Sequence, residues 1–238
     1  WRISSDGIYI DSTRIDVQSL RAFNSDRGEG VELDGIASRE YKDSLQLRLT
    51  NFSLSPLSRF TKRLGYGVDA QTNGYVSVRS ALKGARVGAD IAIDSIRVNG
   101  IALPDLNVAS RWDVSRSRAG LFIKKSDDGK EVGRGYFSPT DSRYYANINM
   151  GLSIALLDPL LSGVISDTQG LAMANLTLNG EGRDARLNGE ILVSDMQTTL
   201  DYTKCRYTAP NARIEVKNNR FHLQSTPIYD LGKRSGNL

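Results

Sequence analysis

The chain has very little of the chemistry on which metal sites and most enzymes rely. Its 238 residues include one cysteine, Cys205, and one histidine, His222. A single cysteine excludes an internal disulfide, and one residue of each kind cannot assemble a zinc site of the usual Cys/His type. His222 alternates with apolar neighbours in a strand-like segment, which places it on the solvated side. The sequence therefore predicts no metal site, no cofactor, no catalytic residue and no enzymatic activity.

Long apolar runs and runs of one charge are absent as well. No segment approaches the roughly 20 apolar residues that a membrane-spanning helix needs, and no signal peptide is visible. The 31 basic and 27 acidic residues are interspersed, so nucleic acid is not expected as a partner. The net charge of +4 would suit phospholipid head groups or glycans. Because the chain opens on Trp1 and ends just after a turn-like Ser-Gly-Asn, we expect a piece of a longer polypeptide.

What the chain does contain is alternation of apolar and polar residues. In residues 74–84, Val76 and Val78 alternate with polar neighbours, and in residues 85–93 the charged Arg86 and Asp90 face away from the apolar positions. Such alternation is typical of strands with one apolar and one solvated face. The sequence therefore predicts an all-β fold with an elongated, repetitive sheet.

The alternating pattern occurs twice. Residues 170–193 match residues 74–93, since each stretch opens with a glycine-to-glycine segment and continues into a similar strand. The second copy carries four extra residues in the turn. Self-similarity of this kind indicates a repeat architecture. We expect strands of a preceding repeat in residues 1–44, a first repeat unit in residues 45–144 and a second in residues 145–238.

Two segments interrupt the strands at equivalent points. Residues 54–64 begin with Ser55-Pro56 and place apolar residues at helical spacing, and residues 154–165 contain Asp158-Pro159 before a second apolar group. Proline is common in the first turn of a helix. We expect short capping helices near residues 56–64 and 158–165.

The apolar positions of the two copies are expected to line one interior. A sheet with one apolar side must fold over on itself, pair with another sheet or hold an apolar ligand. The alternative is that the two faces close into a dry sandwich core. The candidate groove-lining residues are Val76, Val78, Leu82, Val87, Ala89, Ile91, Ile93, Ala172, Ala174, Leu176, Leu178, Leu187, Ile191 and Val193.

Residues 170–238 carry a resemblance to a known family. A Gly-x-x-x-x-x-Leu-x-Leu-x-Gly segment is followed by Ala-Arg-Leu-Asn-Gly-Glu-Ile-Leu-Val, and then by Leu-Asp-Tyr-Thr-Lys-Cys-Arg-Tyr at residues 200–207. This order resembles the repeats of the TamB (translocation and assembly module) family of the AsmA-like superfamily, in the form found in Bacteroidetes. The first copy has no counterpart of residues 202–207.

The resemblance implies a taco-like sheet, curled into a groove with an apolar interior, in the periplasm of a Gram-negative bacterium. It also implies an inner-membrane anchor on the parent protein, phospholipid acyl chains as ligands and a BamA/TamA-like outer-membrane barrel as partner. The implied role is to conduct phospholipid between the two membranes.

Two other functions stay open at this point. The chain could be a scaffold or chaperone that takes in strands of outer-membrane barrels by β-augmentation. It could also be a β-solenoid enzyme acting on polysaccharide, which would need clustered carboxylates or basic residues in equivalent layers and a coil spacing of about 20 to 30 residues.

Overall fold

Almost all of the regular structure is β. The computed structural model describes residues 1–62, 65–159, 162–230 and 233–237. Strands account for 70% of the residues and helices for 4%, which confirms the predicted all-β class. The chain divides into two compact units. Unit 1 comprises Trp1–Leu57, Asp69–Ile96 and Pro104–Arg143, and unit 2 comprises Ser58–Val68, Arg97–Leu103 and Tyr144–Leu238.

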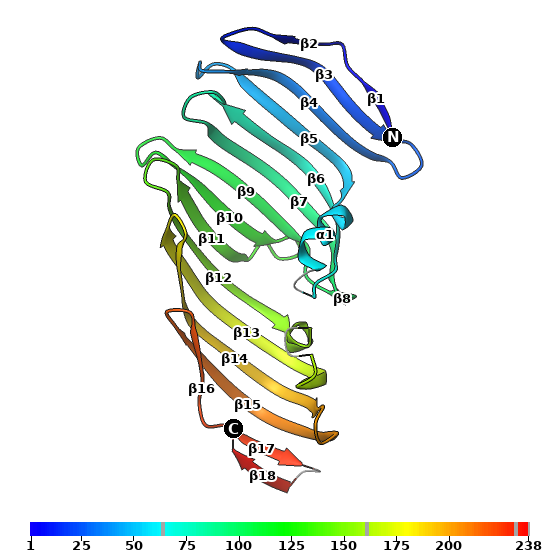
Figure 1. Ribbon diagram of the computed structural model, residues 1–238, viewed down its shortest axis with the longest axis vertical. Coiled ribbons are helices and arrows are strands. Elements are labelled where there is room, and N and C mark those ends of the chain that lie inside the picture. Colours follow the sequence, from blue (N-terminus) through cyan, green and yellow to red (C-terminus); the bar gives the residue numbers. More distant parts are fainter. Residues whose placement is uncertain (63–64, 160–161, 231–232, 238) are drawn as a thin grey trace. The chain divides into compact units, whose positions relative to one another are not determined.

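Unit 1 is an antiparallel meander in which strands that are neighbours in sequence lie side by side (Figure 1). The short β1 and β2 both pair with β3, and β7 pairs with β9. The strands are β1 (Arg2–Ser4), β2 (Gly7–Ile10), β3 (Arg14–Asn24), β4 (Glu29–Ser38), β5 (Ser44–Ser53), β6 (Val68–Arg79), β7 (Arg86–Val98), β9 (Leu106–Asp113), β10 (Arg118–Lys125) and β11 (Glu131–Ser138).

Unit 2 is also built from antiparallel strands, and several of them are longer than those of unit 1. β13 pairs with β14 and β14 with β15, all antiparallel, and β15 then pairs with both β16 and β17. The strands are β8 (Ile101–Ala102), β12 (Arg143–Ser153), β13 (Ile165–Glu181), β14 (Asp184–Leu200), β15 (Cys205–Lys217), β16 (Arg220–Leu223), β17 (Pro227–Asp230) and β18 (Lys233–Asn237).

Of the two predicted helices, the first is present and the second is not where it was expected. A 3-10 turn η1 (Ser55–Leu57) leads into α1 (Ser58–Thr61). In the second segment a 3-10 turn η3 (Ile154–Leu157) comes before Pro159, which has no N–H with which to continue the turn. The prediction for residues 158–165 is therefore wrong for the part described, where Val164 is exposed. Residues 63–64 and 160–161 lie outside the described residues.

The strand pairing repeats with a spacing of 100 residues. In β6, Gly74 lies so close to Asp90 and Ile91 of β7 that a Cβ atom would collide with their backbone. Ala174 of β13 pairs with Ile191 of β14, so both partners are shifted by 100 residues. The predicted alignment of Gly74 with Gly170 is thus displaced by four residues. Four is an even number, so the assignment of side chains to faces does not change.

Residues in the left-handed conformation bend several strands. Ser19, Asn51 and Ser95 have φ of 48°, 45° and 55°, and the first two coincide with register shifts in β3 and β5. Such bulges bend a strand and increase its twist. Each of the three N–H groups, which the ladder leaves free, donates to a side-chain oxygen: Ser19 to Asp34 at 3.0 Å, Asn51 to Asn73 at 2.9 Å and Ser95 to Asp105 at 2.7 Å.

Few apolar side chains are fully buried. Those that are, such as Val17, Val193 and Val216, lie singly within strands. The accessible surface is 15128 Å², whereas two compact globules, each with half the mass, would expose roughly 13,000 Å² together.

A strand glycine provides a test of the described pairing. Gly189 has φ of 135°, and a Cβ there would collide with the backbone of Asn175 and Leu176. Gly189→Ala should therefore lower the free energy of unfolding by more than the roughly 1–2 kcal/mol that a left-handed alanine costs without a clash. Urea unfolding measures the change.

Gly182→Ala is the matched control. Gly182 also has positive φ, at 58°, but no atom lies within 4 Å of the added Cβ. Equal losses in the two variants would contradict the described register of β13 and β14.

Candidate functional site

Strand register places the candidate residues of unit 2 on one face of the sheet. Residues that pair directly across two antiparallel strands point to the same side. The pairs between β13 and β14 join predicted residues to each other: Ala172 with Val193, Ala174 with Ile191 and Leu178 with Leu187. Leu176 pairs with Gly189. The face continues onto β15, where Ile214 pairs with Ile191 and Val216 with Gly189.

The candidate residues of unit 1 also share one face. Val76 and Val78 of β6 pair with Leu47 and Leu45 of β5, and Ile91 of β7 pairs with Val108 of β9. The same side of the sheet carries apolar residues that were not among the predicted set, although the same alternation marks them: Val31 and Leu33 of β4, Leu49 of β5, Leu106 of β9 and Leu121 and Ile123 of β10. We call the two surfaces the apolar faces of units 1 and 2.

Most residues of the apolar faces are partly exposed, whereas Ala89, Val193 and Val216 are buried. Leu47, Val76, Ile91, Leu176 and Ile191 are all of intermediate exposure. In a closed sandwich, central residues of this size would be buried. Within each unit, neighbouring side chains of the same sheet cover these residues only in part. Whether the two faces line one interior stays a prediction.

Leu82 does not belong to the apolar face. It lies in the turn after β6, where its side chain is 47% exposed and its N–H donates to the carbonyl oxygen of Ser38 at 2.9 Å. The glycine-to-glycine pattern extended the strand to residue 84, but β6 ends at Arg79. The prediction that Leu82 lines the face is wrong.

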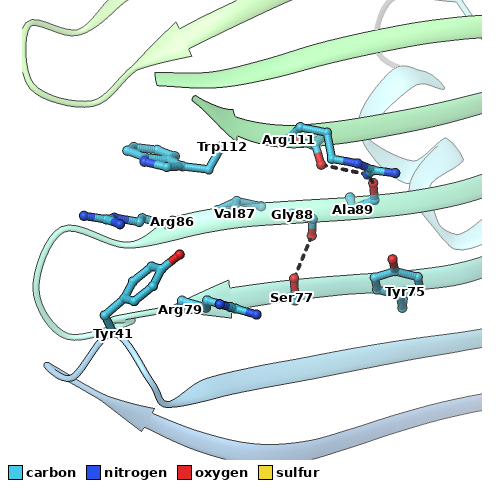
Figure 2. Close-up of a pocket in the computed structure, with 11 residues that line it drawn as sticks. Tyr41, Tyr75, Ser77, Arg79, Arg86, Val87, Gly88, Ala89, Arg111 and Trp112 are labelled. Atoms are coloured by element: carbon cyan, nitrogen blue, oxygen red, sulfur yellow. Dashed lines mark hydrogen bonds between the residues drawn. The ribbon is translucent and has the colours of Figure 1, made fainter. Parts of the chain in front are cut away.

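The opposite, polar face of unit 1 holds a recess of about 290 Å³ that the sequence did not reveal. Figure 2 shows arginine and aromatic side chains around it. We call it the arginine recess. Its lining side chains on the polar side come from the β4–β5 loop and from β6, β7 and β9: Tyr41, Tyr75, Ser77, Arg79, Arg86 and Arg111. Trp112, near the end of β9, also lines the recess, although its register is that of the apolar face.

The guanidinium groups of two of its arginines lie over aromatic rings. The guanidinium carbon of Arg86 lies 4.5 Å from the ring centroid of Tyr41 and 5.9 Å from that of Trp112, and the guanidinium carbon of Arg79 lies 5.4 Å from the centroid of Tyr41. Within this distance the negative face of an aromatic ring attracts a cation. Arg111 is held differently, since it donates to the carbonyl oxygen of Ala89 at 2.7 Å and to Asp90 at 2.9 Å.

Carboxylates close to the recess are already engaged. Asp90 pairs with Arg111. Asp113, next to Trp112 at the end of β9, accepts hydrogen bonds from Ser115 and Arg116, and these bonds lower its pKa to about 2. Asp113 therefore remains ionised at neutral pH, and both carboxylates are directed toward partners of their own.

Comparisons with models of protein families, with curated proteins and with solved structures found no match to this chain. In the part of the chain that the structure describes, no three His, Cys, Asp or Glu residues gather as metal ligands. No helix among the described residues is long and apolar enough to cross a membrane.

The hydrogen bond from Ser115 is the largest cause of the low pKa of Asp113. Ser115→Ala should raise this pKa toward the ordinary value near 3.9. Because the folded-state pKa lies below the unfolded one, the contribution of Asp113 to stability is present above about pH 4 and is lost as the pH falls through about 2. Carbon-detected NMR titration of the Asp113 carboxyl measures both points. A midpoint that does not move in the variant would contradict the assignment.

Proposed function

We propose that the chain is a segment of a lipid-conducting bridge whose apolar faces bind phospholipid acyl chains. The observation that carries the proposal is the row of half-exposed apolar side chains that continues from strand to strand within each unit. A surface of this kind needs a covering, and acyl chains gain about 0.8 kcal/mol for each methylene removed from water.

The repetition of the apolar pattern from strand to strand also supports movement of acyl chains along the face, as opposed to binding at one fixed place. Neighbouring strands lie about 4.8 Å apart, so each strand adds a similar apolar step to the face. Small residues such as Ala89, Ala172, Ala174 and Gly189 leave space between the larger ones. An acyl chain on such a track meets a nearly uniform environment and can shift from one step to the next with a small barrier.

The place of the chain in the cell belongs to the same proposal. A bridge of this type would stand in the periplasm, with the parent protein anchored in the inner membrane and a BamA/TamA-like barrel at its outer end. The support for this part is the resemblance of residues 170–238 to the TamB repeats.

A charge on the apolar face tests the proposal. Ile91→Glu should reduce phospholipid carried by the purified chain about tenfold, because an acyl chain would have to desolvate the carboxylate. Native mass spectrometry after incubation with phospholipid vesicles measures the bound lipid. In cells that depend on the parent protein, the same change should make the outer membrane leaky to detergent.

Ala92→Glu is the matched control. Ala92 follows Ile91 in β7 and points to the opposite face, where it pairs with Asn107. This variant should keep its lipid. Equal lipid binding by the two variants would refute the proposal. Loss of the folded state in Ile91→Glu would instead indicate a closed core, since an open face leaves the carboxylate hydrated.

A further inference from the structure

The arginine recess presents hydrogen-bond donors that no protein group uses. Among the described residues, Arg79 and Arg86 have neither a carboxylate within ion-pair distance nor a hydrogen-bond acceptor, and their contacts are those with Tyr41 and Trp112. A guanidinium held over a ring by cation–π attraction makes no hydrogen bond in that contact, so its N–H groups can donate to another partner. The guanidinium N–H groups of Arg79 and Arg86 therefore have no hydrogen-bond acceptor among the described residues.

The local charge favours an anion. Arg111 and Asp90 form an ion pair at 2.9 Å, so they contribute little net charge. Arg79 and Arg86 then leave the recess with an uncompensated positive charge. Tyr75 adds a hydroxyl group to the lining, and Ser77 donates its hydroxyl proton to the carbonyl oxygen of Gly88 at 3.4 Å (Figure 2).

The hollow at the equivalent place in unit 2 has no unpaired arginine in its lining. This hollow is lined by Asn175, Thr177, Asn188, Glu190, Arg213 and Glu215. With the spacing of 100 residues, Asn175 and Asn179 stand where unit 1 has Tyr75 and Arg79. Its arginine, Arg213, is paired with Glu190. Arg186 corresponds to Arg86 but does not line this hollow, whose one lining arginine is paired, so the hollow of unit 2 has no uncompensated positive charge among its lining residues.

We propose that the arginine recess binds the phosphate group of a phosphoester. Guanidinium groups donate pairs of parallel hydrogen bonds to phosphate oxygens, and the volume of about 290 Å³ is at the lower end of small-molecule sites. The phosphoester is either a phospholipid head group at a membrane surface or a soluble organic phosphate. The site lies on the face opposite to the proposed acyl-chain track and does not depend on that proposal.

Binding experiments with the folded chain test the site. The probes are glycerol 3-phosphate, and phosphatidylcholine vesicles with and without phosphatidylglycerol. NMR shifts of the arginine side-chain N–H signals report binding of the soluble probe, and sedimentation reports binding to vesicles. Arg79→Gln and Arg86→Gln should each raise the Kd at least tenfold, because each removes a charge-assisted pair of hydrogen bonds.

Two further variants separate the site from general charge. Arg21→Gln removes the same charge from the polar face of unit 1 at a site where the arginine pairs with Glu32, and it should leave binding unchanged. Arg86→Lys keeps the charge but loses the planar fork, and it should weaken binding. All variants change exposed or half-exposed side chains, and circular dichroism verifies their folding.

Each outcome decides the proposal. Binding of glycerol 3-phosphate that depends on Arg79 and Arg86 supports a soluble phosphoester, and binding only to vesicles with the same dependence supports a lipid head group. Absence of binding to every probe would overturn the proposal. So would an equal loss of affinity in Arg21→Gln, which would mean that only the overall charge attracts the anion.

Discussion

The fold depends on the alternation of apolar and polar residues, which places the apolar residues of each unit on one side of its sheet. Alternation puts Leu47, Val76 and Ile91 on the same side of unit 1, and Leu176 and Ile191 on the same side of unit 2. Side chains on adjacent strands then cover one another only in part. Each strand adds a ladder of hydrogen bonds to its neighbours, and the proposed function assigns the partly exposed apolar side to a lipid ligand.

Two local features of the backbone accompany this sheet: residues in the left-handed conformation and glycines at close approaches between strands. Left-handed residues such as Ser19 and Asn51 interrupt the ladder, and a side chain of the neighbouring strand accepts each displaced N–H. Gly74 and Gly189 allow the backbone of the next strand to come closer than any side chain would permit. A residue with a side chain at either position would push the paired strands apart.

Much of the fold could be predicted from the sequence, because period-two alternation determines both the strand and its face. The ends of strands and the positions of the short turns are harder to predict, because tertiary contacts determine them. The strand ends at Arg79 before it reaches Leu82, and the second turn covers Ile154–Leu157, where Ile154 is buried, and ends before Pro159. The arginine recess could not be foreseen, since Tyr41, Arg86 and Trp112 come from separate segments that only strand pairing brings together.

The most direct test of the central claim maps the lipid onto the sheet. A photoreactive phenylalanine derivative, introduced singly at Ile91, Ala92, Leu176 or Thr177, would be irradiated with phospholipid vesicles present, and lipid adducts measured by mass spectrometry. The account predicts adducts at Ile91 and Leu176 and few at Ala92 and Thr177, which point to the polar side. Equal labelling on both sides of the sheet, or none at Ile91 and Leu176, would contradict it.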